Sequence, residues 1–524
     1  MDLPSILRRT ISLVLHAGEM VRAEFLRPDG PRGSGHKAPV DTEIEIFLRD
    51  ALRDVVRVSF VGEETPPVLD GDRSWCWLVD PHDGTSEFLR GARGSSVAVA
   101  LLRDGVPVLG VVHAPLSADR GSDLIGWAEG MDHLIRNGVA IRPDLASRGL
   151  TADEIVLLAY RSYARPATNM RRIAPARFVS SNSVAYRLAR VAAGDAVATA
   201  SRQAGLSAYD YAAGHALLRG AGCVLLDGAG NPPVYGPDGT GGMDKCFAGA
   251  PAAVHALLGR DWSLGQPPET PLPERVTLSP PRIEDGLDRA IGCLAGLAIG
   301  EGPGPDGLPG QAGPGMEAAL ALARSLIVDD ELQADSRAVE PVLRCAPLAI
   351  GARPGEAAPL AVANARLTHG DKNSVQACAP VAAAIATAVG GGSREDMLRA
   401  ALDAAAAQPD GDVLRALQAP EAQPPEAGDR ALFLLQSGFF HLMRGTPIAE
   451  LRGADPIAGA LLGAVGGRGA LPSRDLLDLL SCRPLAAFGA RRPRPPECWA
   501  DDLPPLAEAL LSRATRRAPG RDLG

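Results

Sequence analysis

The chain has 524 residues, of which 46% are apolar and 22% are charged. This length exceeds one ordinary hydrophobic core, so two domains of roughly 250 residues each are expected. The formal net charge of −9 argues against a dedicated nucleic-acid binder, because such proteins carry a basic face. The longest apolar run near the N-terminus, Ile11–Leu15, is too short for a signal peptide or a membrane span. Eight scattered cysteines without a C-x-x-C pair are typical of a reducing cytosol, so we expect a cytoplasmic protein.

Predicted elements of the first half alternate between helices and strands. Amphipathic helices are expected over residues 1–26 and 42–55, because apolar residues recur there at helical spacing. Two apolar runs joined at Asp104-Gly105 predict a hairpin. The remaining strands and helices are expected at 58–61, 75–79, 155–160, 177–180, 183–193, 196–200, 211–220 and 223–226. This alternation predicts an α/β or α+β sandwich with acidic residues gathered at strand ends.

The composition becomes Pro-rich and polar between residues 261 and 285, which predicts a domain boundary. We therefore expect a first domain at 1–262, a linker at 263–284 and a second domain at 285–524. Strand patterns vanish after residue 285. Helices rich in Ala and Leu are expected there at 286–299, 316–327, 374–389, 429–444 and 457–465, so the second domain is predicted to be all-α.

The stretch from Trp77 to Ser86, W-L-V-D-P-H-D-G-T-S, combines features of a metal site and a phosphate site. Asp80 and Asp83 lie three residues apart on a turn after a buried strand, and hard divalent cations prefer carboxylate oxygens. Free N–H groups at a helix that opens after Gly84 and Thr85 would favour a phosphate. The alternative is a polar turn that merely ends a strand. We favour the functional interpretation because so many residue types are constrained at once.

Two further acidic segments complete a pattern. Gly62-Glu63-Glu64 is expected at a strand end, and Tyr209-Asp210 begins a run Y-D-Y-A-A-G at a helix start. The three segments, in this order and at this spacing, resemble the inositol monophosphatase family over residues 1–260. That family includes phosphatases of inositol phosphates, of 3′-phosphoadenosine 5′-phosphate and of fructose 1,6-bisphosphate. The resemblance implies an α+β layered sandwich.

The resemblance also implies the site. Its metal ligands would be Glu63, Asp80, Asp83 and Asp210, holding two or three Mg²⁺ ions, and the carbonyl of His82 would add another oxygen.

Three residues are expected to be catalytic, namely Asp41, Asp83 and Thr85. Thr85, paired with Asp41, would orient a metal-activated water, so no covalent intermediate is needed. The backbone N–H groups of Gly84 and Thr85 would hold the phosphate.

Several positions depart from the family pattern. His82 stands where Leu or Ile is usual, and its ring adds a titratable group. The loop between Lys37 and Asp41 is several residues shorter than in the family, where it helps to place a third ion. Asn182 replaces a common Gly, and Asn tolerates a positive φ. Other polar residues have ordinary interpretations: Arg161 and its neighbours as a solvated loop, and His215 as a packed helix residue.

The second half resembles the ADP-ribosylglycohydrolase family over about 285–490, beginning with the helix Asp288–Glu301. That family needs Mg²⁺ held by a Thr-Asp-Asp-Thr run and an Asp-x-Asp-Thr run. Here the corresponding segments are Gln311–Pro314 and Arg452–Pro456, which lack most of the carboxylates. We infer that this domain has lost hydrolase activity and is a binding or interaction module.

The sequence thus predicts a Mg²⁺-dependent phosphomonoesterase for a small phosphorylated metabolite, such as an inositol, nucleotide or sugar phosphate. No nucleic-acid or membrane partner is expected. The helical domain would stabilise the enzyme, mediate homo-oligomer formation or shape access to the site. The alternative is a non-catalytic sensor of a phosphorylated nucleotide or an ADP-ribose-like ligand. The complete ligand set in the first domain favours catalysis there.

Overall fold

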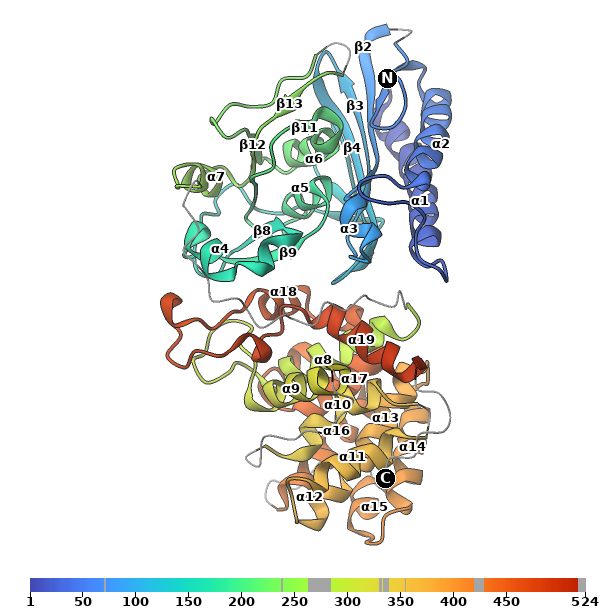
Figure 1. Ribbon diagram of the computed structural model, residues 1–524, viewed down its shortest axis with the longest axis vertical. Coiled ribbons are helices and arrows are strands. Elements are labelled where there is room, and N and C mark those ends of the chain that lie inside the picture. Colours follow the sequence, from blue (N-terminus) through green and yellow to red (C-terminus); the bar gives the residue numbers. More distant parts are fainter. Residues whose placement is uncertain are drawn as a thin grey trace. The chain divides into compact units, whose positions relative to one another are not determined.

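The computed structural model describes residues 1–69, 72–236, 239–262, 284–328, 332, 339–353, 355–418 and 428–516. Contacts divide the chain into two compact units, Met1–Pro271 and Leu272–Gly524 (Figure 1). The predicted linker at 263–284 lies outside the described residues, except for its last residue.

The first unit is built around a seven-stranded sheet in which the strands follow sequence order. Strands β1 and β2 are parallel, and the remaining pairs are antiparallel. The strands are β1 Val58–Gly62, β2 Asp72–Asp83, β3 Ser96–Arg103, β4 Val106–Ser117, β5 Gly121–Ala128, β6 Leu134–Arg136 and β7 Val139–Ile141. The predicted hairpin is present: Asp104 and Gly105 both adopt positive φ, at 50° and 72°, as a two-residue hairpin turn requires.

Helices cover both faces of this sheet (Figure 1). On one face pack α1 (Leu3–Phe25) and α2 (Pro39–Val55). On the other pack α5 (Val184–Ala192) and α6 (Ala208–Gly220). The apolar stripes of α1 and α2 join the sheet in one core that includes Val14, Phe25 and Trp77. The packing of helices and sheets confirms the α+β layered sandwich.

A second sheet of five strands lies beyond α5 and α6, in the order β12-β14-β10-β8-β9. Strands β8, β9 and β10 are parallel, so their carboxyl ends share one edge. The remaining elements of the first unit are α3 Thr85–Leu89, β8 Ile155–Ala159, η1 Tyr160–Ala164, α4 Pro166–Ile173, β9 Arg177–Ser181, β10 Ala198–Ser201, β11 Leu206–Ser207, β12 Val224–Leu226, β13 Gly242–Met243, β14 Cys246–Gly249 and α7 Pro251–Leu258.

All the regular elements in the described residues of the second unit are helices. Its elements are α8 Leu287–Glu301, α9 Pro314–Val328, η2 Pro341–Arg344, α10 Cys345–Ile350, α11 Ala357–Arg366, α12 Lys372–Gln376, α13 Cys378–Val389, α14 Arg394–Ala406, α15 Asp412–Leu417, α16 Arg430–Arg444, η3 Ile448–Leu451, α17 Pro456–Gly466, η4 Arg468–Ala470, α18 Ser473–Ser481, η5 Ala486–Phe488, η6 Pro496–Cys498 and α19 Leu503–Arg516. No described helix in the chain is long and apolar enough to span a membrane.

Glycines let α8 and α17 pack backbone against backbone in this unit. A Cβ on Gly296 would lie 2.1 Å from the Gly459 carbonyl oxygen, and one on Gly463 would lie 2.0 Å from that of Gly292. Atoms this close must move apart, so any larger residue would separate the two helices. The Gly-rich composition of both segments is therefore a packing requirement.

Candidate active site

The segment with Asp80 and Asp83 belongs to strand β2, whereas we expected it to lie on a turn after the strand. Strand β2 continues to Asp83, with Asp80 opposite Ala98 and Asp83 opposite Ser96. Three steps along β2 therefore match two along β3, which defines a bulge that re-aims the acidic side chains. The isolated apolar pattern at 75–79 could not reveal this continuation, because pairing with β3 sustains the strand.

Gly84 follows the bulge and caps α3 in the left-handed conformation, with φ of 100°. A Cβ there would also lie 2.8 Å from the Asn182 amide nitrogen, which donates a hydrogen bond to the Gly84 carbonyl at 3.2 Å. Asn182 itself does not have a positive φ, contrary to our expectation. Its amide instead fills the space that glycine leaves.

Asp83 is held by the start of α5. Its Oδ2 accepts hydrogen bonds from the Ser183 hydroxyl and the Ala185 N–H, both at 2.7 Å. Ser183 also caps α5, because its hydroxyl oxygen accepts from the Tyr186 N–H at 2.9 Å. The position of α5 therefore fixes one oxygen of Asp83.

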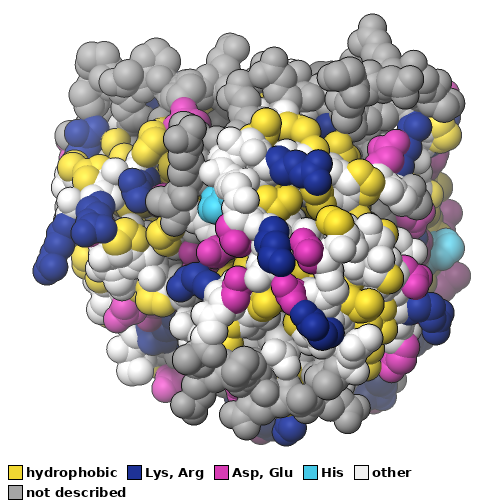
Figure 2. Space-filling model, turned by 90° about the horizontal axis from the view of Figure 1, so that it is seen from below, with side chains coloured by type: hydrophobic (Ala, Val, Ile, Leu, Met, Phe, Trp, Pro, Cys, Tyr) yellow, Lys and Arg dark blue, Asp and Glu magenta, His cyan; other side chains and the backbone are white. Residues whose placement is uncertain are grey.

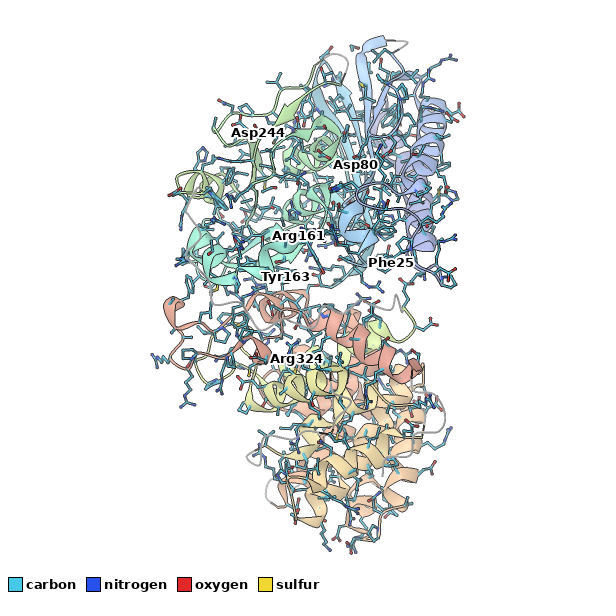
Figure 3. All side chains as sticks on the ribbon, viewed as in Figure 1. Phe25, Asp80, Arg161, Tyr163, Asp244 and Arg324 are labelled. Atoms are coloured by element: carbon cyan, nitrogen blue, oxygen red, sulfur yellow. The ribbon has the colours of Figure 1, made fainter. Side chains whose placement is uncertain are left out.

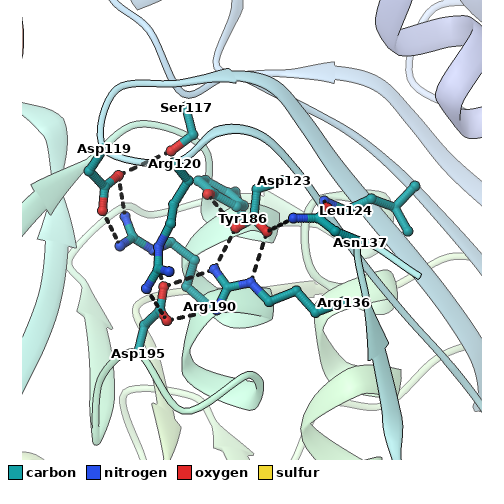
Figure 4. A network of polar contacts seen from close by, with 10 residues as sticks. All are labelled: Ser117, Asp119, Arg120, Asp123, Leu124, Arg136, Asn137, Tyr186, Arg190 and Asp195. Atoms are coloured by element: carbon teal, nitrogen blue, oxygen red, sulfur yellow. Dashed lines mark hydrogen bonds and ion pairs between the residues drawn. The ribbon is translucent and has the colours of Figure 1, made fainter. Parts of the chain in front are cut away.

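A buried network of three acids and three arginines anchors α5 in turn (Figure 4). Arg190 of α5 forms ion pairs with Asp119 at 2.5 Å and Asp195 at 2.9 Å. Arg136 binds Asp195 at 2.8 Å and Asp123 at 2.6 Å, and Asp123 also accepts from the Tyr186 hydroxyl at 2.7 Å. The third arginine, Arg120, binds Asp195 at 2.6 Å. Since each charge is paired, the network can remain buried while it ties α5 to β5 and β6.

Helix α2 positions Glu63 through a residue that the sequence analysis overlooked. The carboxylate of Glu45, fully buried, accepts from the N–H groups of Glu64 and Thr65, both at 2.7 Å, and from the Thr65 hydroxyl at 2.6 Å. A Cβ on Gly62 would lie 2.2 Å from the Glu45 carboxyl carbon. The glycine of the Gly-Glu-Glu motif is thus needed to admit the side chain that holds the loop.

Asp210 occupies the first turn of α6, which begins earlier than predicted. Its Oδ2 accepts from the Ser207 N–H at 2.7 Å as part of a capping box. The carboxylate is therefore held at the helix start, where the helix dipole favours negative charge.

Asp41 lies inside α2 rather than in the loop before it. Its Oδ2 accepts from the Ala38 N–H at 3.2 Å and from the Thr85 hydroxyl at 3.1 Å. Its Oδ1 is 2.7 Å from Nδ1 of the buried His82 ring, whose Nε2 is 2.9 Å from the Ser95 hydroxyl. The structure thus brings Asp41 and Thr85 together and adds two unexpected partners.

The four predicted metal ligands share an electrostatic environment that disfavours their ionised forms. Burial, reinforced by the other three acids, raises the pKa of Asp80 well above its usual range. Burial and then Asp83 raise the pKa of Asp210 to about 7. Burial of its carboxylate, with Asp210 and Asp83 next in effect, raises the pKa of Glu63 to about 8, although the residue as a whole remains exposed. Burial also raises the pKa of Asp83, and its hydrogen bonds to Ser183 and Ala185 oppose the change.

This environment fits cations. Asp80 is 1% exposed, and its Oδ2 is buried without any hydrogen-bond partner, whereas Oδ1 accepts from the His82 N–H at 2.9 Å. An orphaned carboxylate oxygen among other acids is the environment a divalent ion would satisfy. As the side chains stand, no three His, Cys, Asp or Glu groups in the described residues converge tightly enough to enclose an ion.

Other polar residues of the first unit, among them Arg161 and Tyr163, which are labelled in Figure 3, have structural roles. Arg161 lies on η1 and donates to Glu87 at 2.8 Å, while Tyr163 packs edge-on against Tyr160. His215 stacks on Tyr235 and lies 2.9 Å from its hydroxyl, which confirms the packed helix residue.

Two acids of the second unit accept hydrogen bonds at helix starts. Asp455 caps α17 by accepting from the Ala458 N–H at 2.8 Å, and it also accepts from the Ser437 hydroxyl. Glu301 accepts from two N–H groups at the start of α9, at 2.6 and 2.8 Å. Gln311 is buried, and the segment Gln311–Pro314 contains no carboxylate. Among the described residues seen from below, basic and acidic side chains are interspersed on the surface (Figure 2).

Comparisons with known proteins match a different family to each half of the chain. The profile of the inositol monophosphatase family matches residues 2–258, and that of ADP-ribosylglycohydrolase matches residues 304–450. A probable inositol 1-monophosphatase, ImpA of Mycobacterium tuberculosis, is 30% identical over 244 residues, covering 45% of this chain and 85% of ImpA. The 3′(2′),5′-bisphosphate nucleotidase CysQ of Escherichia coli K12 is 28% identical over 240 residues, covering 44% and 94%.

A solved structure of the suppressor protein SuhB from Bartonella henselae is 22% identical, with a TM-score of 0.40, covering 48% of this chain and 97% of SuhB. The ImpA and CysQ relatives are phosphatases, and their family is generally metal-dependent. The chain belongs to the inositol monophosphatase family through its N-terminal unit, and an ADP-ribosylglycohydrolase domain follows in the same chain.

Proposed function

We propose that the first unit is a Mg²⁺-dependent phosphomonoesterase that hydrolyses a small phosphorylated metabolite. The observation that carries this proposal is the orphaned Oδ2 of Asp80 among three further acids whose pKa values are raised together. Such a cluster stores repulsion that two or three divalent cations would relieve. A purely structural role would leave this repulsion without compensation.

Each residue of the predicted site has a proposed role. Glu63, Asp80, Asp83, Asp210 and the carbonyl of His82 would hold the ions, which when bound activate water and neutralise phosphoryl oxygens. Asp41 accepts from the Thr85 hydroxyl, and this fixed pair would orient the attacking water. Gly84 is the N-cap of α3 and Thr85 is its first residue, so their N–H groups have no acceptor within the helix. They would bind the phosphate.

The names of the relatives define the substrates to be tested. ImpA is named as an inositol 1-monophosphatase and CysQ as a bisphosphate nucleotidase. We propose that the substrate of this chain is a small inositol, nucleotide or sugar phosphate. None of the eight cysteines, all of which the structure describes, forms a disulfide, and this supports the cytoplasmic location that we propose.

A screen of phosphorylated metabolites tests this function. Inositol 1-phosphate, adenosine 3′,5′-bisphosphate and fructose 1,6-bisphosphate would be incubated with the full chain, and released phosphate would be measured with malachite green. Chelation should stop the release and Mg²⁺ should restore it. The absence of Mg²⁺-dependent phosphate release from every compound would instead favour the sensor alternative.

For the second unit we propose a non-catalytic binding or interaction module. The capping role of Asp455 and the segment Gln311–Pro314, which contains no carboxylate, support this proposal. The full chain should therefore release no ADP-ribose from ADP-ribosylated arginine in the presence of Mg²⁺. Release that survives inactivation of the first unit would contradict the proposal.

A further inference from the structure

The side chain of His82 lies in a buried line of hydrogen bonds that runs from Ser95 to Thr85. The ring is inaccessible to solvent and lies between Ser95 and Asp41. Phe88 fixes the ring plane from the side, with the ring centroids 4.3 Å apart at 85°. Both ring nitrogens are therefore occupied, and the ring has no room to turn.

The direction of these bonds follows from the acceptor at one end. Asp41 Oδ1 is a carboxylate oxygen, so Nδ1 of His82 carries the hydrogen and donates to it. Nε2 then accepts from the Ser95 hydroxyl in the neutral ring.

His82 contacts the Asp41–Thr85 pair at two places. Its ring binds Asp41 Oδ1, while its carbonyl oxygen is 2.8 Å from the Thr85 hydroxyl. Asp41 is 2% exposed, and its other oxygen accepts from Thr85 and from the Ala38 N–H. A carboxylate turns easily about its last torsion, because that torsion has broad wells. With donors on both oxygens, the Asp41 carboxylate is locked in one plane.

We propose that His82 is a positioning residue that fixes the plane of Asp41 and thereby the direction of the Thr85 hydroxyl. This inference rests on the proposed phosphatase function, in which the Asp41–Thr85 pair orients the attacking water. Loss of the ring donor would leave Asp41 Oδ1 buried without a partner and free the carboxylate to rotate. Because small displacements at a reacting centre cost large factors in rate, the loss should appear in kcat.

Two conservative substitutions separate the ring's two hydrogen bonds. In His82→Asn the amide nitrogen takes the place of Nδ1 and keeps the donor to Asp41, whereas in His82→Gln the amide reaches the place of Nε2 and loses it. Both variants retain the carbonyl of residue 82 and both remove the ring. We expect His82→Asn to lower kcat by about threefold, and His82→Gln by about tenfold to hundredfold.

The KM and the Mg²⁺ concentration for half-maximal activity should change little in either variant. Ser95→Ala removes only the outer bond, so it should resemble His82→Asn. Equal kcat values for the Asn and Gln variants, or losses that appear in KM or in the Mg²⁺ requirement rather than in kcat, would overturn the positioning role. A wild-type chain that releases no phosphate would overturn the proposed function itself, and this inference with it.

A spectroscopic measurement covers the case in which the His82 variants do not fold. NMR spectra of the wild-type chain and of Asp41→Asn, both labelled with ¹⁵N-histidine, would be compared, and the ring signal that moves would be assigned to His82. In the wild type this signal should show a proton on Nδ1. A ring protonated on Nε2 alone would contradict the proposal.

Discussion

Asp210→Asn should stabilise the metal-free protein at pH 8, although it removes a proposed metal ligand. The pKa of Asp210 is about 7 in the folded chain against an ordinary 3.8. A difference of this size corresponds to roughly 4 kcal/mol of unfavourable free energy once the group is ionised. Because Asp210 is partly exposed and solvent screens its charge, we expect about half of that, ~2 kcal/mol.

The sign follows from proton binding. Between pH 3.8 and about 7 the folded chain holds the Asp210 proton more tightly than the unfolded chain, so stability falls as pH rises through this window. The advantage of Asp210→Asn should grow from pH 4 to pH 7 and then remain constant. The Asn side chain retains an oxygen that can accept from the Ser207 N–H, so the helix cap is preserved.

Thermal unfolding at several pH values, with and without Mg²⁺, measures this change in stability. The transition of the first unit is identified as the one whose melting temperature Mg²⁺ changes. We expect the variant to melt about 4–8 °C higher than the wild type at pH 8 without metal. Mg²⁺ should raise the wild-type transition more than that of the variant. Asp50→Asn, at a side chain that is 69% exposed, is the matched control and should shift neither. A variant less stable than the wild type, or an advantage independent of pH, would refute the electrostatic argument.

Three further changes test the supports of the two units. Glu45→Ala removes three hydrogen bonds from the loop that carries Glu63, so it should lower the free energy of unfolding in urea by about 2–4 kcal/mol. It should also raise the Mg²⁺ concentration needed for activity, and an unchanged Mg²⁺ dependence would contradict this role. Asp195→Asn leaves buried arginines without their full counter-charge and should cost about 3–5 kcal/mol, whereas a neutral result would show the network to be dispensable. Gly296→Ala should destabilise the second unit by about 1–3 kcal/mol in calorimetry, while Gly411→Ala, which has open space, should not.

The residues with the strongest local signals could be placed from the sequence. The acids at 63, 80, 83 and 210 lie at a strand end, on a bulge and in a first helical turn, where turn and cap chemistry leave clear patterns. The hairpin at Asp104-Gly105 was equally visible, since few residue pairs accept two positive φ angles.

Contacts between distant segments could not be predicted. The pairing of His82 with Asp41 joins residues 41 positions apart, and nothing local reports it. Strands β6 and β7 were missed because each is only three residues long and depends on its neighbours for pairing. Glu45 did leave a signal: it lies one turn after Asp41, beside the apolar residues Ile44 and Leu48 on the buried face of α2. A charged residue in that stripe indicates a buried partner.

The most direct test of the phosphatase proposal is the turnover of Asp83→Asn. Asp83 would bind metal with the oxygen that Ser183 and Ala185 leave free, and Asn keeps one oxygen able to accept their hydrogen bonds. Phosphate release would be compared between the wild type, Asp83→Asn and the control Asp50→Asn at saturating Mg²⁺, with melting temperatures as a check on folding. We predict that Asp83→Asn folds but releases no phosphate above background, while the control matches the wild type. Turnover of a folded Asp83→Asn at the wild-type rate would contradict the proposed active site.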